Sequence, residues 1–482
     1  MPKTLLLIVL LCIVTRLPQL LSDQLLLDSD ECIVGLMAKH SSEGKDVQAY
    51  FYGQSYGFTL LETTTIRIFY SLFGISDIAV KMAMLLLWIL GILLFYLTLV
   101  QLNEKHSWLP LLVTLVFVFS PAWSTWAMKA RGGYLTSFLL SSCFVYLVFH
   151  KQLGRRLWIQ VLLGFILIAV YESKPLWLAG LIPLWVAGLI HHKKAWYGFA
   201  VIIGMLAGWE FFYPFKQQAI NYWEAPKLLI PQNMFETISE LPALILKSLK
   251  ANYYLGQELS LNPATNVFVY GFVFLVFIVL AIGLYRMAKE KKANTLFFFS
   301  LMSVLATIFS VVFMQYPSPR YLLPLTGYLL LTMFLAVRGF EKTVILKIGT
   351  SFLIVAGIFS LFVQKDYTFG NTKRKDLIEA INYMESKDIH YAFCKNGLLQ
   401  WQVVFYSNES ILARYIYSTD RYPPYVKKVT EALSSDNGHT ALVKFSKSFK
   451  EGTTPNARKF GKDLVVFLYP DKKRIEDEGF AL

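Results

Sequence analysis

Charged residues are scarce in this chain of 482 residues. They make up 16% of the sequence, whereas soluble globular proteins average about 25%. Hydrophobic residues account for 55% of the chain, and the mean hydropathy is +0.48. This balance argues against a soluble domain and predicts an all-α protein that crosses a membrane several times.

Cysteine is scarce as well. The four cysteines, Cys12, Cys32, Cys143 and Cys394, show no CxxC spacing, so the pattern argues against a metal site built on cysteine pairs. Cys32 and Cys394 are both expected on the outer face of the membrane. A disulfide between them is the less favoured alternative to two free thiols.

The sequence also lacks a nucleic-acid-binding pattern, although its net charge is +14. Many basic residues lie in short loops between hydrophobic runs, where they act as topology signals. The tail contains no basic helix and no zinc-finger spacing. We therefore expect no nucleic-acid partner.

Long hydrophobic runs, by contrast, are abundant. A helix needs about 20 apolar residues to cross about 30 Å of hydrocarbon. The first run has a basic start but no small-residue cleavage site after it, so we predict an uncleaved transmembrane helix. About eleven such runs lie near residues 4–21, 77–101, 108–127, 134–150, 157–172, 176–190, 195–213, 266–286, 295–314, 321–338 and 344–363.

The loops between these runs differ in basic charge. One set contains HKQLGRR, HHKK and RMAKEKK, and the alternate set holds fewer lysines and arginines. The positive-inside rule places the first set, and with it the N-terminus, in the cytoplasm. Eleven spans then place the C-terminus outside. We predict a multi-pass protein of the cell (inner) membrane with outer segments 22–76, 214–265 and 364–482.

The tail has a different composition from the rest of the chain. KRKDLIEAINYMESKDI has helical spacing of apolar residues, HYAFC, ILARYIY and DLVVFLY resemble strands, and GLLQWQVVFYS indicates a helix. The sequence therefore predicts two parts. Residues 1–363 form a transmembrane domain, and residues 364–482 form a small extracytoplasmic α/β domain.

Two adjacent carboxylates, Asp30 and Glu31, open the first outer loop, and the aromatic stretch FYGQSYG follows them. One interpretation is structural, because acidic residues stabilise the first turn of a helix, here ECIVGLMAKH. The other is chemical, because a carboxylate at the membrane surface can take a proton from an acceptor hydroxyl. A positioned base contributes about 10²–10⁴ in rate. The two roles are compatible.

A first transmembrane run, an Asp-Glu loop and an amphipathic segment, ETTTIRIFYSLF, together resemble the GT-C class of glycosyltransferases. That class includes protein O-mannosyltransferases and lipid A aminoarabinose transferases, which use polyprenyl-phosphate-linked sugars. The loop DECIVGLMAKHSSEGKDVQAYFYGQSYGFTLLE, the stretch PSPRYLLPL, and the tail from HYAFC through STDRYPPYVKKV are similar to bacterial members of the class. The resemblance runs from one end of the chain to the other.

The resemblance implies roles for particular residues. Asp30 matches the general base and Glu31 its acidic neighbour, whereas Arg320 and Tyr321 match an outer Arg-Tyr pair near the lipid phosphate. Two departures leave the contacts to the donor phosphate open. Gln54 stands where the better-studied families place His or Lys before Pro-Pro, and the second outer loop, MKARGGY, lacks the acid that those families often carry.

A leaving polyprenyl phosphate gains negative charge, and arginine offers it bidentate hydrogen bonds. The alternative for each basic residue near the outer face is snorkelling to the headgroups at a helix end. The outer-side candidates are Arg320, Arg131, Lys129 and Arg67.

The stretch FYGQSYG supplies candidates for contacts with the sugar or the lipid, namely Tyr52, Gln54 and Tyr56. An interfacial belt of tyrosines without a catalytic role is the alternative.

Two further acids have weaker claims to a role. Glu172, in YESKP, lies at the outer end of the fifth run, where a carboxylate is costly unless it is solvated or paired, and simple pairing with Lys174 is the alternative. Glu62 is interpreted mainly as the solvated face of an interfacial helix. A divalent cation is left open as a cofactor, because carboxylates alone do not name one.

We therefore predict an integral membrane glycosyltransferase. It would move a sugar from a polyprenyl-phosphate donor to a glycan, lipid or protein acceptor on the outer face, next to membrane lipids. The main alternative is a transporter or flippase of lipid-linked intermediates, which would carry ionisable residues within several spans. A membrane anchor whose tail binds a partner is a third alternative, but it gives no reason for the Asp-Glu loop.

Overall fold

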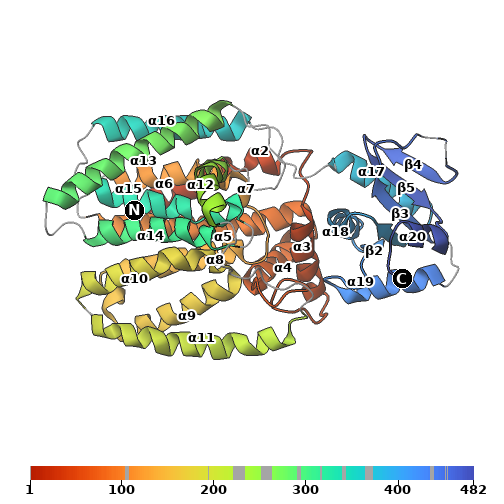
Figure 1. The fold of residues 1–482 in the computed structure, drawn as a ribbon, viewed down its shortest axis with the longest axis horizontal. Helices are drawn as coiled ribbons and strands as arrows, with labels where there is room; N and C mark the ends of the chain where they lie inside the picture. The colour runs from red at the N-terminus through yellow and green to blue at the C-terminus, as the bar shows by residue number, and fades with distance from the viewer. Residues whose placement is uncertain are drawn as a thin grey trace.

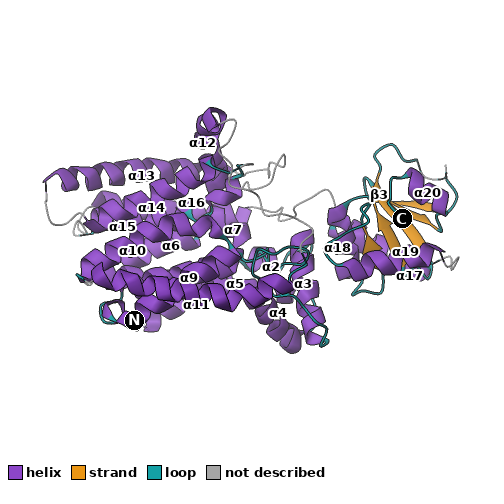
Figure 2. Cartoon of the chain, turned by 60° about the horizontal axis from the view of Figure 1, so that its bottom comes forward, coloured by secondary structure: helices purple, strands orange, loops and turns teal. Residues whose placement is uncertain are grey.

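The computed structural model of the chain describes residues 2–103, 108–193, 195–220, 234–250, 263–289, 295–314, 317–338, 344–363, 373–434, 439–450, 452 and 454–482. A helical bundle and a small α/β domain lie at opposite ends of the long axis, and α3 (Ser29–Ser42) lies between them (Figure 1). The N-terminus is at the end of the bundle remote from the α/β domain (Figures 1 and 2). This separation agrees with an odd number of spans, and the side that faces the cytoplasm stays a prediction.

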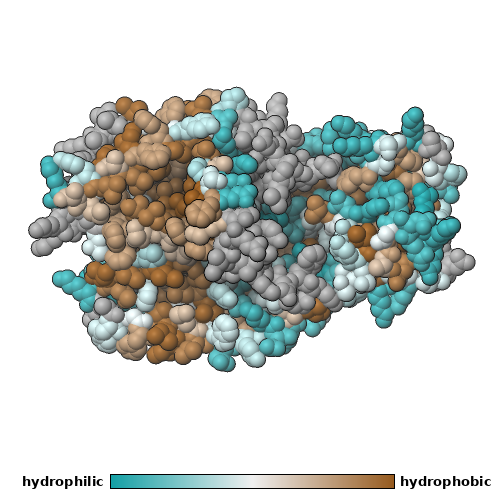
Figure 3. Space-filling view, viewed as in Figure 1, coloured by the Kyte–Doolittle hydropathy of each residue, from teal (hydrophilic) through white to brown (hydrophobic). Residues whose placement is uncertain are grey.

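Each of the eleven predicted hydrophobic runs is largely helical, and the runs 4–21 and 108–127 each form two helices. Among the described residues, seven helical segments are long and apolar enough to cross a membrane, namely Pro2–Leu20, Asp77–Leu102, Pro175–His192, Trp196–Gln218, Pro263–Lys289, Thr295–Val312 and Pro319–Val337. Four shorter apolar helices correspond to the remaining runs, namely Leu109–Val118, Tyr134–Phe149, Leu157–Ser173 and Lys347–Leu361. On the face seen in the space-filling view, the surface over this bundle is mostly apolar, whereas hydrophilic residues predominate over the α/β domain (Figure 3).

The helices of the bundle are numbered in the order in which they occur along the chain. They are α1 (Pro2–Val14), α2 (Leu17–Leu20), α5 (Asp77–Leu102), α6 (Leu109–Val118), α7 (Ala122–Trp126), α8 (Tyr134–Phe149), α9 (Leu157–Ser173), α10 (Leu178–His192), α11 (Phe199–Gln218), α13 (Pro263–Lys289), α14 (Thr295–Val312), α15 (Leu325–Val337) and α16 (Val344–Val363). Short 3-10 turns η1 (Leu153–Arg155), η2 (Pro175–Trp177), η3 (Ala195–Gly198) and η4 (Pro319–Leu322) link several of them.

Small residues let two of these helices come very close. A Cβ atom on Gly164 of α9 or on Gly204 of α11 would overlap the backbone of the facing helix. Close contact of this kind drives helix association where lipid removes the hydrophobic driving force. It holds the middle of α9, whose C-terminal end carries Glu172, against α11.

The segments that were predicted to lie outside contain further helices. The first holds α3 and α4 (Leu60–Phe73), and α4 leaves Ile68, Leu72 and Phe73 exposed, as an interfacial helix would. The second holds α12 (Met234–Leu249), whereas its residues 221–233 and 251–262 lie outside the described residues. Cys32 and Cys394 are both buried and free, so the disulfide alternative is not realised.

The C-terminal domain confirms the predicted elements. They are α17 (Arg374–Ser386), β1 (Tyr391–Cys394), α18 (Gly397–Tyr406), β2 (Leu412–Arg414) and β5 (Leu464–Leu468). Two strands were not predicted, namely β3 (Thr440–Phe445) and β4 (Ala457–Phe460), and the helices α19 (Pro423–Ser434) and α20 (Lys472–Asp477) complete the domain.

The sheet of this domain has the order β2-β1-β3-β5-β4. β1 is parallel to both β2 and β3, and β5 is antiparallel to both β3 and β4. Tyr391 pairs with Thr440 in the β1–β3 register. The residues just before these two strands therefore lie side by side at one edge of the sheet.

Candidate active site

A cavity of about 710 Å³ opens where the first outer loop, the bundle and the C-terminal domain meet. Most of the residues proposed from the sequence line it, namely Asp30, Gln54, Tyr56, Arg131, Glu172, Arg320 and Tyr321. Glu31, Glu62 and Tyr52 do not line it. The structure thus brings side chains from positions 30 to 321 into one cavity. The sequence predicted only that they lie on the same side of the membrane.

Asp30 enters the cavity from the first turn of α3. Its side chain is 22% exposed, and Arg131 Nη2 lies 2.8 Å from its Oδ2 atom. The ion pair holds one carboxylate oxygen. The other oxygen has no partner among the described residues, so it is available to a hydroxyl that enters the cavity.

Glu31, its neighbour, points the other way. Asp28 caps α3, and the backbone N–H of Asp28 donates to Glu31 Oε2 at 3.1 Å, which completes a capping box. The Glu31 side chain is 1% exposed and forms an ion pair with buried Lys81. Glu31 therefore stabilises the start of α3, as the structural interpretation proposed. Of the two acids, only Asp30 lines the cavity.

Glu62 is not on a solvated face, so that interpretation is wrong. Its side chain is fully buried, and Oε1 accepts from the backbone N–H groups of Leu135 and Thr136 at 3.2 and 3.4 Å. These groups belong to the first turn of α8, where a helix leaves unsatisfied donors that attract a carboxylate. Burial raises the pKa of Glu62 to about 7, against the opposing effect of the hydrogen bonds from the helix.

Glu172 lines the cavity wall but does not pair with Lys174. Lys216 Nζ donates to its two oxygens at 3.0 and 3.1 Å, and the hydroxyl of Tyr50 donates to Oε2 at 2.9 Å. The backbone carbonyl of Glu172 accepts from the N–H groups of Gly57 and Phe58. Glu172 thereby ties the first outer loop to α9 and α11.

Lys174 faces the cavity and lies against aromatic rings. Its Nζ atom is 4.9 Å from the ring centre of Tyr134 and 5.7 Å from that of Tyr56. Burial, together with repulsion from Arg320 and Arg131, lowers the pKa of Lys174 to about 7. A buried amine that is only partly charged at neutral pH is poised to respond to an incoming anion.

Arg320 and Tyr321 form the wall contributed by η4. The guanidinium of Arg320 lies 5.4 Å from the ring centre of Tyr321. The buried Nε atom of Arg320 has no hydrogen-bond partner among the described residues. A charged donor left in this state is costly unless a ligand completes it.

Tyr52 lies at the junction between the first loop and the C-terminal domain. Its hydroxyl is 2.9 Å from His40 Nδ1, and its ring stacks on Tyr422 with centroids 4.9 Å apart. His40 is fully buried, and its Nε2 atom lies 3.0 Å from Glu409 Oε1. Tyr52 is therefore not among the residues that line the cavity.

The C-terminal domain adds a cavity residue that sequence reasoning missed. Arg421 lines the cavity, donates to the backbone carbonyl of Tyr52 at 3.3 Å, and lies 4.9 Å from the ring centre of Phe51. Gly53 has φ +71°, and a Cβ on it would be 2.7 Å from the Cα of Arg421. Only glycine allows so close an approach in that conformation.

Comparison with solved structures identifies the architecture. ArnT from Cupriavidus metallidurans, bound to undecaprenyl phosphate, superposes with a TM-score of 0.63 at 12% identity, covering 96% of this chain and 97% of ArnT. The apo state of that protein gives the same values. The oligosaccharyltransferase of Archaeoglobus fulgidus gives a TM-score of 0.51 at 10% identity, covering 92% of this chain and 69% of that chain. The chain has the GT-C fold.

Sequence comparisons add nothing to this identification. A scan against models of known protein families finds no match, and a search of curated proteins finds none either. The similarity to GT-C proteins is therefore one of backbone structure. The fold alone does not assign the function of the site, which depends on the chain's own side chains.

The charge in this GT-C cavity is unbalanced. Its lining holds two acids, Asp30 and Glu172, and a larger number of basic residues, namely Arg131, Lys174, Lys216, Arg320 and Arg421. Three of these basic residues were not proposed from the sequence as site residues. Lys174 and Lys216 each follow an ordinary hydrophobic run, so the sequence did not distinguish them from other basic residues at helix ends. Arg421 lies in STDRYPPYV, a stretch that resembles GT-C members, and this was the one sequence feature that could have indicated it.

The acids of the cavity do not fit a divalent cation. Asp30 is paired with Arg131, and Glu172 is paired with Lys216. Among the described residues, the one group of three His, Cys, Asp or Glu side chains with ligand atoms close together lies in the C-terminal domain.

Proposed function

We propose that the chain is a membrane glycosyltransferase that takes a sugar from a polyprenyl-phosphate donor and attaches it to an acceptor hydroxyl at the cavity. The observation that carries this proposal is the lining of the cavity. Asp30, which has only one oxygen in an ion pair, and an excess of basic side chains face the same space. ArnT, which shares the fold, has been solved with undecaprenyl phosphate bound, and this supports a ligand of the same class here.

The basic residues suit the phosphate of such a donor. A phosphate that leaves the sugar gains negative charge, and guanidinium groups bind it with paired, charge-assisted hydrogen bonds. Arg320 offers a buried Nε–H that has no partner among the described residues, and Arg421 approaches from the opposite domain. Lys174 would take up a proton as the anion arrives, because a nearby negative charge raises the pKa of an amine.

Asp30 is the proposed general base. The acceptor hydroxyl gives its proton to the free oxygen of Asp30 while its own oxygen attacks the anomeric carbon of the sugar. The bond between that carbon and the phosphate oxygen breaks, and the polyprenyl phosphate leaves with the electron pair. A direct displacement of this kind inverts the anomeric centre. Arg131 holds the second carboxylate oxygen and so fixes the direction in which Asp30 points.

The test is Asp30→Asn, which keeps the shape of the side chain but removes the base. Membranes that contain the full chain would be supplied with a panel of radiolabelled polyprenyl-phosphate sugars, and transfer would be measured as labelled acceptor. We expect transfer to fall by about 10²–10⁴-fold, whereas binding of undecaprenyl phosphate to the purified variant persists.

The matched control is Asp46→Asn. Asp46 is exposed, lies in the same outer loop and does not line the cavity, so this variant should transfer sugar at the normal rate. Undiminished transfer by Asp30→Asn would remove the assignment of the base. Loss of undecaprenyl phosphate binding in the same variant would show that Asp30 acts in binding instead.

A further inference from the structure

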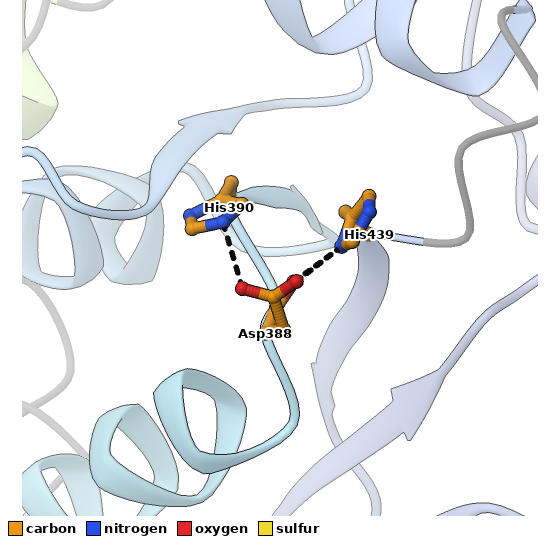
Figure 4. A group of neighbouring side chains, drawn as sticks. All are labelled: Asp388, His390 and His439. Atoms are coloured by element: carbon orange, nitrogen blue, oxygen red, sulfur yellow. Dashed lines mark hydrogen bonds and ion pairs between the residues drawn. The ribbon is translucent and has the colours of Figure 1, made fainter.

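A second cluster of chemically reactive side chains lies in the C-terminal domain, at the edge of the sheet where β1 and β3 begin. Asp388, His390 and His439 place their ligand atoms within 4.8 Å of one another (Figure 4). We propose that these three residues bind a divalent transition-metal ion of the zinc type. This site is separate from the cavity, and the proposal does not depend on glycosyl transfer.

The backbone holds the two histidines side by side. His390 directly precedes β1 and His439 directly precedes β3, which are neighbouring parallel strands. The backbone N–H groups of His390 and Tyr391 both donate to the carbonyl of His439, at 3.1 and 3.2 Å. The register of the sheet thus fixes the two imidazoles near each other, with ring centroids 5.7 Å apart.

The carboxylate of Asp388 lies between the two rings, as Figure 4 shows. His390 Nε2 is 3.1 Å from its Oδ1 atom, and His439 Nδ1 is 3.1 Å from its Oδ2 atom. Metal–ligand bonds of about 2.0–2.2 Å place ligand atoms up to about 4.4 Å apart. His439 Nδ1 also lies 2.7 Å from the backbone carbonyl oxygen of Asp388, and this hydrogen bond would break when the nitrogen binds an ion.

The conformation of Asp388 is a second observation. It follows α17 with φ +57°, in the left-handed region that usually holds glycine after a helix. An aspartate there costs more backbone energy than glycine would, although its side chain is 71% exposed and contributes nothing to the core.

The donor set selects the kind of ion. Two imidazoles and one carboxylate suit zinc and its neighbours, such as cobalt and nickel, whereas calcium and magnesium prefer oxygen ligands alone. All three side chains are exposed or half-buried, so water can complete the coordination. An ion bound here would link the turn after α17 to the start of β3.

The experiment uses the full chain in detergent, freed of any histidine tag and treated with a chelator that is then removed. Zn²⁺ is titrated by calorimetry, and Co²⁺ is added separately because its visible spectrum reports nitrogen ligation. We expect the chain to bind Zn²⁺ with a component that weakens at least about 10-fold in His390→Ala and in His439→Ala. Zn²⁺ should also raise the thermal unfolding temperature of the unsubstituted chain and leave that of the double variant unchanged.

Asp388→Asn keeps the size of the side chain and tolerates the left-handed turn, so it should fold normally and lose the same binding component. Two controls should retain it. His191→Ala removes an exposed imidazole from α10, and Asp30→Asn removes an acid from the cavity. Zn²⁺ titrations that are identical for the unsubstituted chain and Asp388→Asn would overturn the proposal, as would a chain that takes up neither ion.

Discussion

The cavity and the junction between α3 and the C-terminal domain are both rich in charge, but they use it differently. At the junction, Glu409 contacts Lys39, His40 and Tyr425 at once, so its charge is satisfied within the protein. In the cavity, basic residues outnumber acids, and Arg320 keeps an unpartnered Nε–H among the described residues. Satisfied charge at the junction holds two domains together, whereas surplus charge in the cavity is suited to a ligand.

The largest expected effect concerns the junction. Glu409→Gln removes the closer of the two carboxylates that pair with Lys39, and the more exposed Glu43 remains at 3.4 Å. Because Glu409 is only 12% exposed, we expect a loss of about 2–3 kcal/mol in the free energy of unfolding. Urea unfolding of the purified chain measures it. The control Glu431→Gln affects an exposed pair with Lys427 on α19 and should change stability by less than about 0.5 kcal/mol. Equal stability of the two variants would show that the junction charge is not stabilising.

The same carboxylate gives the junction a pH dependence. Burial alone would raise the pKa of Glu409, but hydrogen bonds from His40, Lys39 and Tyr425 outweigh it and hold the pKa well below the usual 4.5. A depressed pKa means that the stabilisation is present above pH 4.5 and is lost as the pH falls below it. The stability difference between the unsubstituted chain and Glu409→Gln should therefore shrink below pH 4.5.

A smaller effect is expected in the cavity, and it should appear in binding rather than in stability. Arg320→Gln removes a charged donor, so the affinity for undecaprenyl phosphate should fall about 10–100-fold, while the unfolding temperature stays the same. The matched control is Arg67→Gln, since Arg67 is an exposed outer arginine outside the cavity. A stability loss without a change in affinity would make Arg320 a structural residue like those of the junction.

The smallest expected effect is a pH dependence of ligand binding in the cavity, caused by the protonation of Lys174. Lys174 has a pKa near 7 in the free cavity, and a bound phosphate favours its charged form. The affinity for undecaprenyl phosphate should therefore decline as the pH rises from 7 to 9, by up to about tenfold. Lys174→Gln should flatten this profile. An equally steep decline in the variant would assign the titration to another group.

Local patterns in the sequence predicted much of the fold. The eleven hydrophobic runs, the helix after Asp28 and the strand HYAFC all follow from periodicity and from capping residues. β4, with the sequence ARKF, was missed because two of its four residues are basic. Its place in the sheet depends on pairing with β5, a contact that local sequence does not contain.

The candidate site was predictable only in part, for a related reason. Asp30, Arg131 and Arg320 could be proposed because each stands near a predicted membrane boundary. The burial of Glu62 could not, since its partners are the backbone donors of α8 more than seventy positions later. The same limit applies to Arg421, whose role depends on a domain that folds back onto the first loop.

That fold-back has a consequence for the timing of synthesis. Arg421 contacts Tyr52, which was made 369 positions earlier, and Lys39 is joined to Glu409 over a similar span. A nascent chain that has inserted every membrane helix still lacks one wall of the cavity. The cavity is therefore complete only after the C-terminal domain has been synthesised and has folded onto the first loop.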